Sequence, residues 1–277
     1  MDAVLVIALA LAGIIVASFL NAAIVRWVGW RVVLPQFGGE LAPASALRDT
    51  PARCRGCGSA LSPWGSRAIS WVGTFGRCRG AEHHRLATRY LVVEVLVAAL
   101  WAAAGAVFGW SLDLIPVLIL LASLVAMAAV DLWVMRIPNR FIYGTHALLI
   151  PTIVAVSLID DEPGRIAGAA VGAISYFGFL FMFHLVSPRR MGFGDVRLAG
   201  VMGLVLGWLG WQADPAGPWF TYPLSWVIWG ALIGSLLGTL MGVVSLVARR
   251  RSRPFPFGPA LAIGCVIVVL AGNSIIG

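Results

Sequence analysis

Long apolar runs alternate with short polar interruptions along the whole chain. A membrane-spanning helix needs about 20 mainly apolar residues, and about eight runs approach or exceed that length. Their predicted bounds are roughly 3–25, 89–110, 114–131, 140–158, 166–187, 196–211, 224–247 and 258–276. The weakest interruption, at 111–114, is marked only by Ser111, Asp113 and Pro116. The pattern therefore predicts an all-α fold, a polytopic membrane helix bundle of about eight transmembrane helices.

The longest interruption separates the first two apolar runs and divides the chain into three predicted parts. These are a first transmembrane helix at 1–25, a small cytoplasmic loop domain at 26–88 and a seven-helix membrane core at 89–277. A signal peptide would begin with a positively charged segment. Here the first positive charge, Arg26, follows the apolar run. We therefore expect the first run to remain in the protein as a membrane span.

The arginines predict how the bundle is oriented. The chain has 20 basic residues, all of them arginine, and all but Arg165 lie on the odd-numbered connections between the predicted spans. Cytoplasmic loops carry the excess of arginine in membrane proteins. We therefore expect the odd connections in the cytoplasm and both termini outside.

Composition excludes two other classes of protein. The residues are 60% hydrophobic and 12% charged, whereas soluble domains are about 45–50% apolar and about 25% charged. The net charge of +8 could indicate nucleic-acid binding, but the placement of the arginines is better explained by membrane orientation. We therefore expect membrane lipids as partners and no nucleic acid.

Several glycines recur at intervals of four residues, which places them on one face of a helix. Small residues on one face allow helices to approach closely in lipid. We therefore expect these glycines to serve packing and not chemistry. The pattern comprises Gly168 and Gly172, Gly203 and Gly207, and the series Gly230, Gly234, Gly238 and Gly242.

Three carboxylates lie within or beside the predicted spans, where ionisable residues are costly and usually functional. They are Glu94, Asp131 and Asp195. Asp131 ends the third span and Asp195 opens the sixth. These spans cross the membrane in opposite directions, so we expect both aspartates at the cytoplasmic end of their helices. Two carboxyl groups held close together cannot both ionise easily, and they can share the work of acid and base.

Such a pair can hydrolyse a peptide without a metal or a covalent intermediate, because one aspartate activates a water while the other donates to the substrate carbonyl. Gly192 and Gly194, just before Asp195, suit a tightly bent backbone or a close approach by substrate. The alternative is that each aspartate is a helix-end charge paired with a nearby arginine, Arg136 or Arg197. A further alternative is a transporter with proton-relaying intramembrane carboxylates, although the two halves of the chain show no clear repeat.

Five motifs, in order along the chain, resemble those of the type IV prepilin peptidases, which are membrane aspartic proteases of the GxGD class. The segment 192–198 is similar to that family's second aspartate motif, although Arg197 stands where lysine is usual. Asp131, followed by Pro138 and Asn139, is similar to the first aspartate motif. The remaining matches are residues 17–21 with Arg26, residues 90–94, and residues 255–259. Presenilin-type GxGD proteases lack the N-terminal signature and the cysteine loop.

The resemblance implies an aspartic endopeptidase of the inner membrane of a prokaryote. It would cut the basic leader from type IV prepilins or pseudopilins, whose leader precedes a long apolar helix. The implied catalytic residues are Asp131 and Asp195, and the implied motif residues are Gly192, Gly194, Arg197, Pro138 and Asn139. Glu94 is a candidate for binding substrate or cofactor; the alternative is that it pairs with Arg89 or with a polar group of a neighbouring helix. The peptidase would need no cofactor, whereas methylation of the new N-terminus, which many family members perform, would use S-adenosylmethionine.

The predicted cytoplasmic loop contains a tentative zinc site. Cys54 and Cys57 form a CxxC pair, and Cys78 follows 21 residues after Cys57. The family often carries two CxxC pairs here, but Ala81 stands at the fourth cysteine position. Tetrahedral zinc could be completed by His83, with His84 or Glu82 as alternatives. The other interpretation is a loop that folds by packing alone. We expect Cys265, in the last span, to be a small buried apolar residue.

Overall fold

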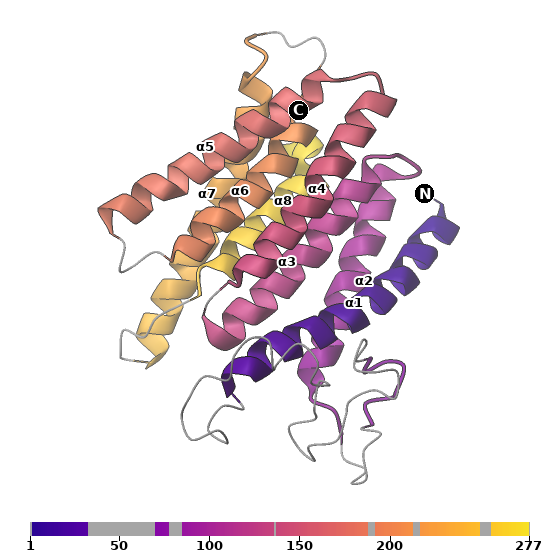
Figure 1. Ribbon diagram of the computed structural model, residues 1–277. Coiled ribbons are helices and arrows are strands. Elements are labelled where there is room, and N and C mark those ends of the chain that lie inside the picture. Colours follow the sequence, from indigo (N-terminus) through magenta and orange to yellow (C-terminus); the bar gives the residue numbers. More distant parts are fainter. Residues whose placement is uncertain are drawn as a thin grey trace. The chain divides into compact units, whose positions relative to one another are not determined.

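The computed structural model describes residues 2–32, 70–77, 85–135, 137–187, 192–212, 217–249 and 256–276. Across these residues the regular structure is helical, apart from one isolated β-bridge between Arg77 and Arg85. The prediction of an all-α bundle is thus confirmed (Figure 1). The described helices are α1 (Ala3–Val32), α2 (Thr88–Phe108), α3 (Leu114–Val134), α4 (Asn139–Ile159), α5 (Gly164–Val186), α6 (Phe193–Leu209), α7 (Thr221–Arg249) and α8 (Gly258–Ile276).

Seven of the described helices are long and apolar enough to cross a membrane. The exception is α6, with 17 residues, which corresponds to the predicted span 196–211. Between Val196 and Trp208 almost every residue of α6 is buried, because neighbouring helices surround it. Helix α1 continues to Val32, beyond the predicted end at residue 25, since no proline or acidic residue interrupts residues 26–32.

The chain divides into two compact units, Met1–Ala103 and Ala104–Gly277, with the division inside α2. Most of the predicted loop domain, residues 33–69 and 78–84, lies outside the described residues. The predicted division into 1–25, 26–88 and 89–277 therefore stays a prediction. In the first unit, α1 and α2 approach closely, since a Cβ on Gly13 would lie 2.9 Å from the Cα of Ala98.

In the second unit, α5 and α6 cross with their backbones in contact. A Cβ on Gly172 would lie 2.2 Å from the carbonyl oxygen of Gly203 and 2.6 Å from the Cα of Gly207. A Cβ on Gly168 would lie 2.7 Å from the carbonyl oxygen of Gly207. Real Cβ atoms essentially never come within 3.0 Å of another heavy atom in this way. Only glycine fits these positions, as the spacing predicted.

The glycine series on α7 serves packing at three of its four positions. A Cβ on Gly234 would lie 2.9 Å from the Cα of Leu261 on α8, and a Cβ on Gly230 would lie 2.9 Å from the side chain of Leu206 on α6. A Cβ on Gly238 would meet the ring of Phe257 at 2.2 Å. Gly242 has open space around its Cβ position, so the prediction of close packing is wrong there.

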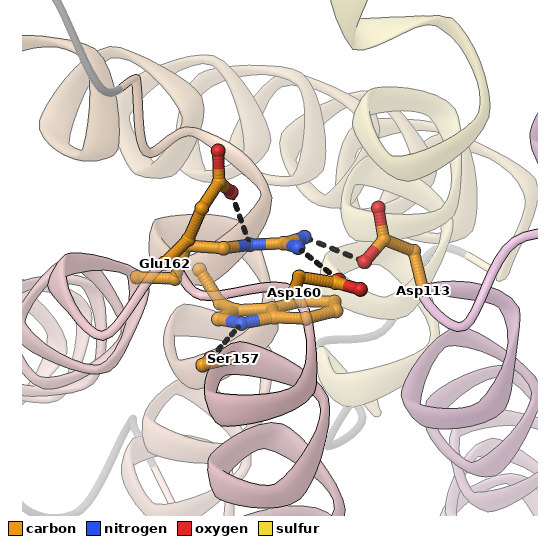
Figure 2. Close-up of polar contacts among 6 residues, drawn as sticks. Asp113, Ser157, Asp160 and Glu162 are labelled. Atoms are coloured by element: carbon orange, nitrogen blue, oxygen red, sulfur yellow. Dashed lines mark hydrogen bonds and ion pairs between the residues drawn. The ribbon is translucent and has the colours of Figure 1, made fainter.

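One buried arginine joins the ends of four helices in the second unit (Figure 2). Arg165, on α5, lies 2.7 Å from Asp113 before α3 and 3.1 Å from Asp160 at the end of α4. Its Nε lies 3.8 Å from a carboxylate oxygen of Glu162. Its guanidinium also stacks 4.0 Å from the ring of Trp208 on α6. We call these five residues the Arg165 cluster.

The Arg165 cluster accounts for the one arginine that departs from the predicted charge bias. Its positive charge is neutralised by three carboxylates, and the side chain is only 9% exposed. The indole N–H of Trp208 in turn donates to the Ser157 hydroxyl at 2.9 Å. Because Asp113 precedes α3 and Asp131 lies near the end of α3, the cluster and the aspartates occupy opposite ends of that helix.

Candidate active site

Asp131 and Asp195 come from two helices that bring their ends together. Asp131 lies in the last turn of α3 and is 5% exposed. Asp195 lies in the first turn of α6, just after Gly192, which caps that helix with an extended backbone. The carbonyl of Gly192 accepts the Asp195 N–H at 3.1 Å. The sequence prediction that the two aspartates share one depth agrees with this arrangement.

A glycine from a third helix lies beside both carboxyl groups. Gly258 is the first residue of α8. A Cβ placed on it would lie 2.9 Å from Asp131 Oδ2 and 3.3 Å from Asp195 Oδ1. Both oxygens therefore face one small space, and the distance between them is less than the sum of these two lengths. Only a residue without a side chain leaves that space open.

The Asp131 carboxyl group is held without a neutralising cation. Its Oδ2 is buried and has no hydrogen-bond partner in the described part of the chain. All the described ion pairs involve Arg165 and not either of these aspartates. Arg136 lies outside the described residues, whereas Arg197 donates to Asn139. Local pairing with Arg197 thus does not account for Asp195.

The segment between α3 and α4 closes one side of the site. Met135 adopts a left-handed conformation (φ 52°) and ends α3, its N–H donating to the Asp131 carbonyl. Pro138 then caps α4 with an extended backbone. Between them, Ile137 lies 3.3 Å from the Cβ positions of both Gly194 and Gly258. The glycines of the second motif and of α8 thus pack on the first aspartate motif.

Arg197 links the two aspartate motifs on their outer side. It donates to the side-chain oxygen of Asn139, the first residue of α4. The same guanidinium lies 4.5 Å from the ring of Phe193 and 5.9 Å from that of Tyr143. Arginine can stack and donate at once because its guanidinium is planar. This contact fixes the start of α4 relative to the start of α6.

Glu94, in the first unit, is fully buried and binds backbone amides. It accepts the N–H groups of Trp71 at 2.8 Å and Val72 at 2.9 Å. Ser18 and Asn21 of α1 also donate to it, at 3.4 and 3.5 Å. The carboxylate therefore fastens residues 70–77 to α1 and α2. Its use of backbone amides could not be inferred from sequence spacing.

The predicted zinc ligands Cys54, Cys57, Cys78 and His83 all lie outside the described residues. Among the residues that are described, no group of three His, Cys, Asp or Glu could hold a metal ion. Cys265 is fully buried in α8, which confirms that it is a packed apolar residue.

Two models of known protein families match this chain. The Type IV leader peptidase family model matches residues 118–243, which include both aspartates, and the Bacterial Peptidase A24 N-terminal domain matches 11–108. No solved structure gives a significant match.

Relatives named "Prepilin leader peptidase/N-methyltransferase" include proteins from three bacteria. The protein from Bacillus subtilis (strain 168) is 33% identical over 208 residues, covering 75% of this chain and 76% of its own length. That from Aeromonas hydrophila is 32% identical over 212 residues, covering 75% and 66%. That from Stutzerimonas stutzeri is 28% identical over 276 residues, covering 95% and 89%.

Proposed function

Because this chain belongs to the type IV leader peptidase family, we propose that Asp131 and Asp195 are the catalytic pair of a membrane-embedded aspartic endopeptidase. The family cleaves leaders from type IV prepilins, and membership decides for a protease over a transporter. One observation carries the assignment of residues. Carboxyl oxygens from two helices lie 2.9 and 3.3 Å from one point, the Cβ position of Gly258.

The chemistry follows from two carboxyl groups that face one space. A water in that space is deprotonated by the ionised aspartate and attacks the scissile carbonyl carbon. The other aspartate, protonated, donates to the carbonyl oxygen. The proton taken from the water then passes to the leaving amine, the C–N bond breaks, and the proton donated to the carbonyl oxygen returns to its aspartate as the new carboxyl group forms. The unpartnered Oδ2 of Asp131 supports this proposal, since it has a lone pair free for the water.

The orientation is also proposed. The arginine distribution puts the aspartate end of the bundle in the cytoplasm and both termini outside, in the inner membrane of a prokaryote. A basic leader would then stay in the cytoplasm while the apolar helix that follows it enters the lipid. The scissile bond between them would reach the aspartates at the membrane face.

Methylation of the mature N-terminus is a second candidate activity, favoured by the names of the relatives. S-adenosylmethionine would supply the methyl group. Glu94 would contribute by holding residues 70–77 in place.

Zinc bound by Cys54, Cys57, Cys78 and His83 stays a prediction. Metal analysis of the purified chain tests it, and a zinc content near zero would remove it.

Co-expression with a candidate prepilin tests the protease assignment. Asp131→Asn and Asp195→Asn keep the size of each side chain but remove its titrating proton. We expect each to lower the cleavage rate by at least about a hundredfold, the usual value of one acid–base group. Asp161→Asn, an exposed carboxylate on the turn after α4, is the matched control and should cleave normally. Wild-type processing by either active-site variant would refute the assignment.

A further inference from the structure

Residues 70–77 form a turn that is fastened inside the depth of two membrane spans of the first unit. Glu94 on α2 accepts the N–H groups of Trp71 and Val72, and Asn21 on α1 donates to the same carboxylate. The two spans are Ala3–Val25 and Thr88–Phe108. At a rise of about 1.5 Å per residue, Asn21 lies about 6 Å before the end of its span and Glu94 about 9 Å after the start of its own. The turn therefore meets both helices inside the boundary of the apolar spans.

The backbone of this turn is paired within the protein, as a segment at that depth requires. The N–H groups of Gly73, Phe75 and Gly76 donate to acceptors in the turn itself, at distances of 2.8–3.2 Å. The amides of Trp71 and Val72 bind Glu94. In lipid, backbone polar groups have to find their partners inside the protein. The turn can thus enter the headgroup layer without carrying these donors into it unpaired.

Phe75 holds an uncovered ring on an unfavourable backbone. Its side chain is 86% exposed, and no other large apolar side chain among the described residues is more exposed. Its backbone is left-handed, with φ 51°, a conformation that residues with a Cβ rarely adopt and that asparagine tolerates better. An aromatic ring kept exposed in a costly conformation points to a contact made outside the chain.

Two exposed arginines lie opposite each other at the end of the turn. Arg77 and Arg85 pair across an isolated antiparallel bridge, and like charges directly opposite on such a pair destabilise it. Every ion pair of the described residues involves Arg165, so none of those pairs neutralises Arg77 or Arg85. Arginines near a membrane surface attract anionic lipids. Lipid phosphates would therefore supply the negative charge that this pair needs.

We propose that the turn at 70–77 binds the membrane surface, with Phe75 in the boundary between headgroups and acyl chains and with Arg77 and Arg85 on the phosphates of anionic lipids. Amphipathic surface segments enter that boundary by about 5–10 Å, which agrees with the depth at which Glu94 holds the turn. Lipid is favoured over a soluble peptide or a second copy of the chain because, at this depth, an exposed ring meets the bilayer first. The proposal does not depend on the proposed function, since neither aspartate takes part in it.

Photocrosslinking in a bilayer tests where the ring lies. The full chain carries p-benzoylphenylalanine at position 75 and is reconstituted in vesicles of equal parts phosphatidylcholine and phosphatidylglycerol. Position 11 is the control in lipid, because Leu11 is 58% exposed within the span of α1. We expect lipid adducts at position 75 within about threefold of the yield at position 11. Lipid adducts at position 11 alone would overturn the proposal, as would adducts of position 75 only with protein.

The identity of the captured lipid tests the role of the two arginines. At position 75 we expect phosphatidylglycerol adducts to exceed phosphatidylcholine adducts by at least about threefold. Arg77→Gln and Arg85→Gln together should remove that preference. Arg140→Gln removes an exposed arginine at the start of α4, and this matched control should keep the preference. The same lipid ratio in the wild type and in the double variant would overturn the proposal.

Hydroxyl-radical footprinting of the native chain in the same vesicles covers the case in which the probe disturbs the turn. Radicals formed in water oxidise hydrated aromatic rings and spare rings in lipid. Phe19, which is 51% exposed within the span of α1, is the comparison. We expect Phe75 to be oxidised within about twofold of the rate of Phe19. Oxidation of Phe75 as fast as in the unfolded chain would place the ring in water and overturn the proposal.

Discussion

Gly172→Ala tests the close crossing of α5 and α6. The added methyl group would lie 2.2 Å from the carbonyl oxygen of Gly203. That atom belongs to helix backbone, which cannot rotate away as a side chain can. The two helices must therefore separate by about 1 Å, a gap that forfeits a quarter to a half of each van der Waals contact it opens.

We expect Gly172→Ala to lower the free energy of unfolding by about 3 kcal/mol, the upper part of the range for overpacked cores. Helix α6 also carries Asp195, so the separation should disturb its position relative to Asp131. Cleavage should therefore fall together with stability. Both effects come from one displacement of α6.

Gly178→Ala is the matched control on the same helix. Nothing lies within 4 Å of its Cβ position, so the only change is the better helix propensity of alanine, worth about 0.5 kcal/mol of added stability. Unfolding in detergent can be followed by the fluorescence of the 12 tryptophans. Equal stability of Gly172→Ala and Gly178→Ala would refute the reasoning, because it would mean that the two backbones are not in contact.

Three further predictions concern separate parts of the molecule. Gly258→Ala should lower cleavage by about a hundredfold, because its methyl group would occupy the space 2.9 Å from Asp131 Oδ2; Gly144→Ala, in open space, should cleave normally, and equal activity of the two would contradict the assigned space. Arg165→Met should lower the free energy of unfolding by about 2 kcal/mol, a value kept small because the carboxylate partners are partly exposed to solvent. Asp161→Asn should leave the free energy of unfolding unchanged when both variants are followed by tryptophan fluorescence. Glu94→Gln should speed amide hydrogen exchange at Trp71 and Val72, which lose a charged acceptor, and unchanged exchange there would contradict the anchoring role.

The sequence predicted the features that repeat or alternate along the chain. Apolar runs gave the helices, because each run must cover the same thickness of lipid. The glycine spacing predicted packing faces on α5, α6 and α7, since intervals of four residues fall on one side of a helix. The arginine counts predicted that Asp131 and Asp195 share a depth, and the two side chains do approach the same glycine.

Other features depend on contacts between distant residues and could not be predicted in this way. The sequence around Gly258 predicts only a motif, because its neighbours carry no sign that two carboxylates will face it. Arg165 departs from the bias of arginine to the odd-numbered connections, and its ion pairs with Asp113 and Asp160 explain why. Glu94 was a candidate for binding substrate, whereas its partners include backbone amides, which leave no trace in the identity of the residues that carry them.

The position of the Arg165 cluster limits how the bundle can move. It ties the beginning of α3, the end of α4, the beginning of α5 and the end of α6 at one extremity. At the aspartate extremity, the described polar side-chain contact among these four helices is that of Arg197 with Asn139, which joins α4 to α6. Separating α3 or α5 from its neighbours therefore breaks ion pairs at the Arg165 extremity, whereas at the aspartate extremity it breaks mainly apolar contacts.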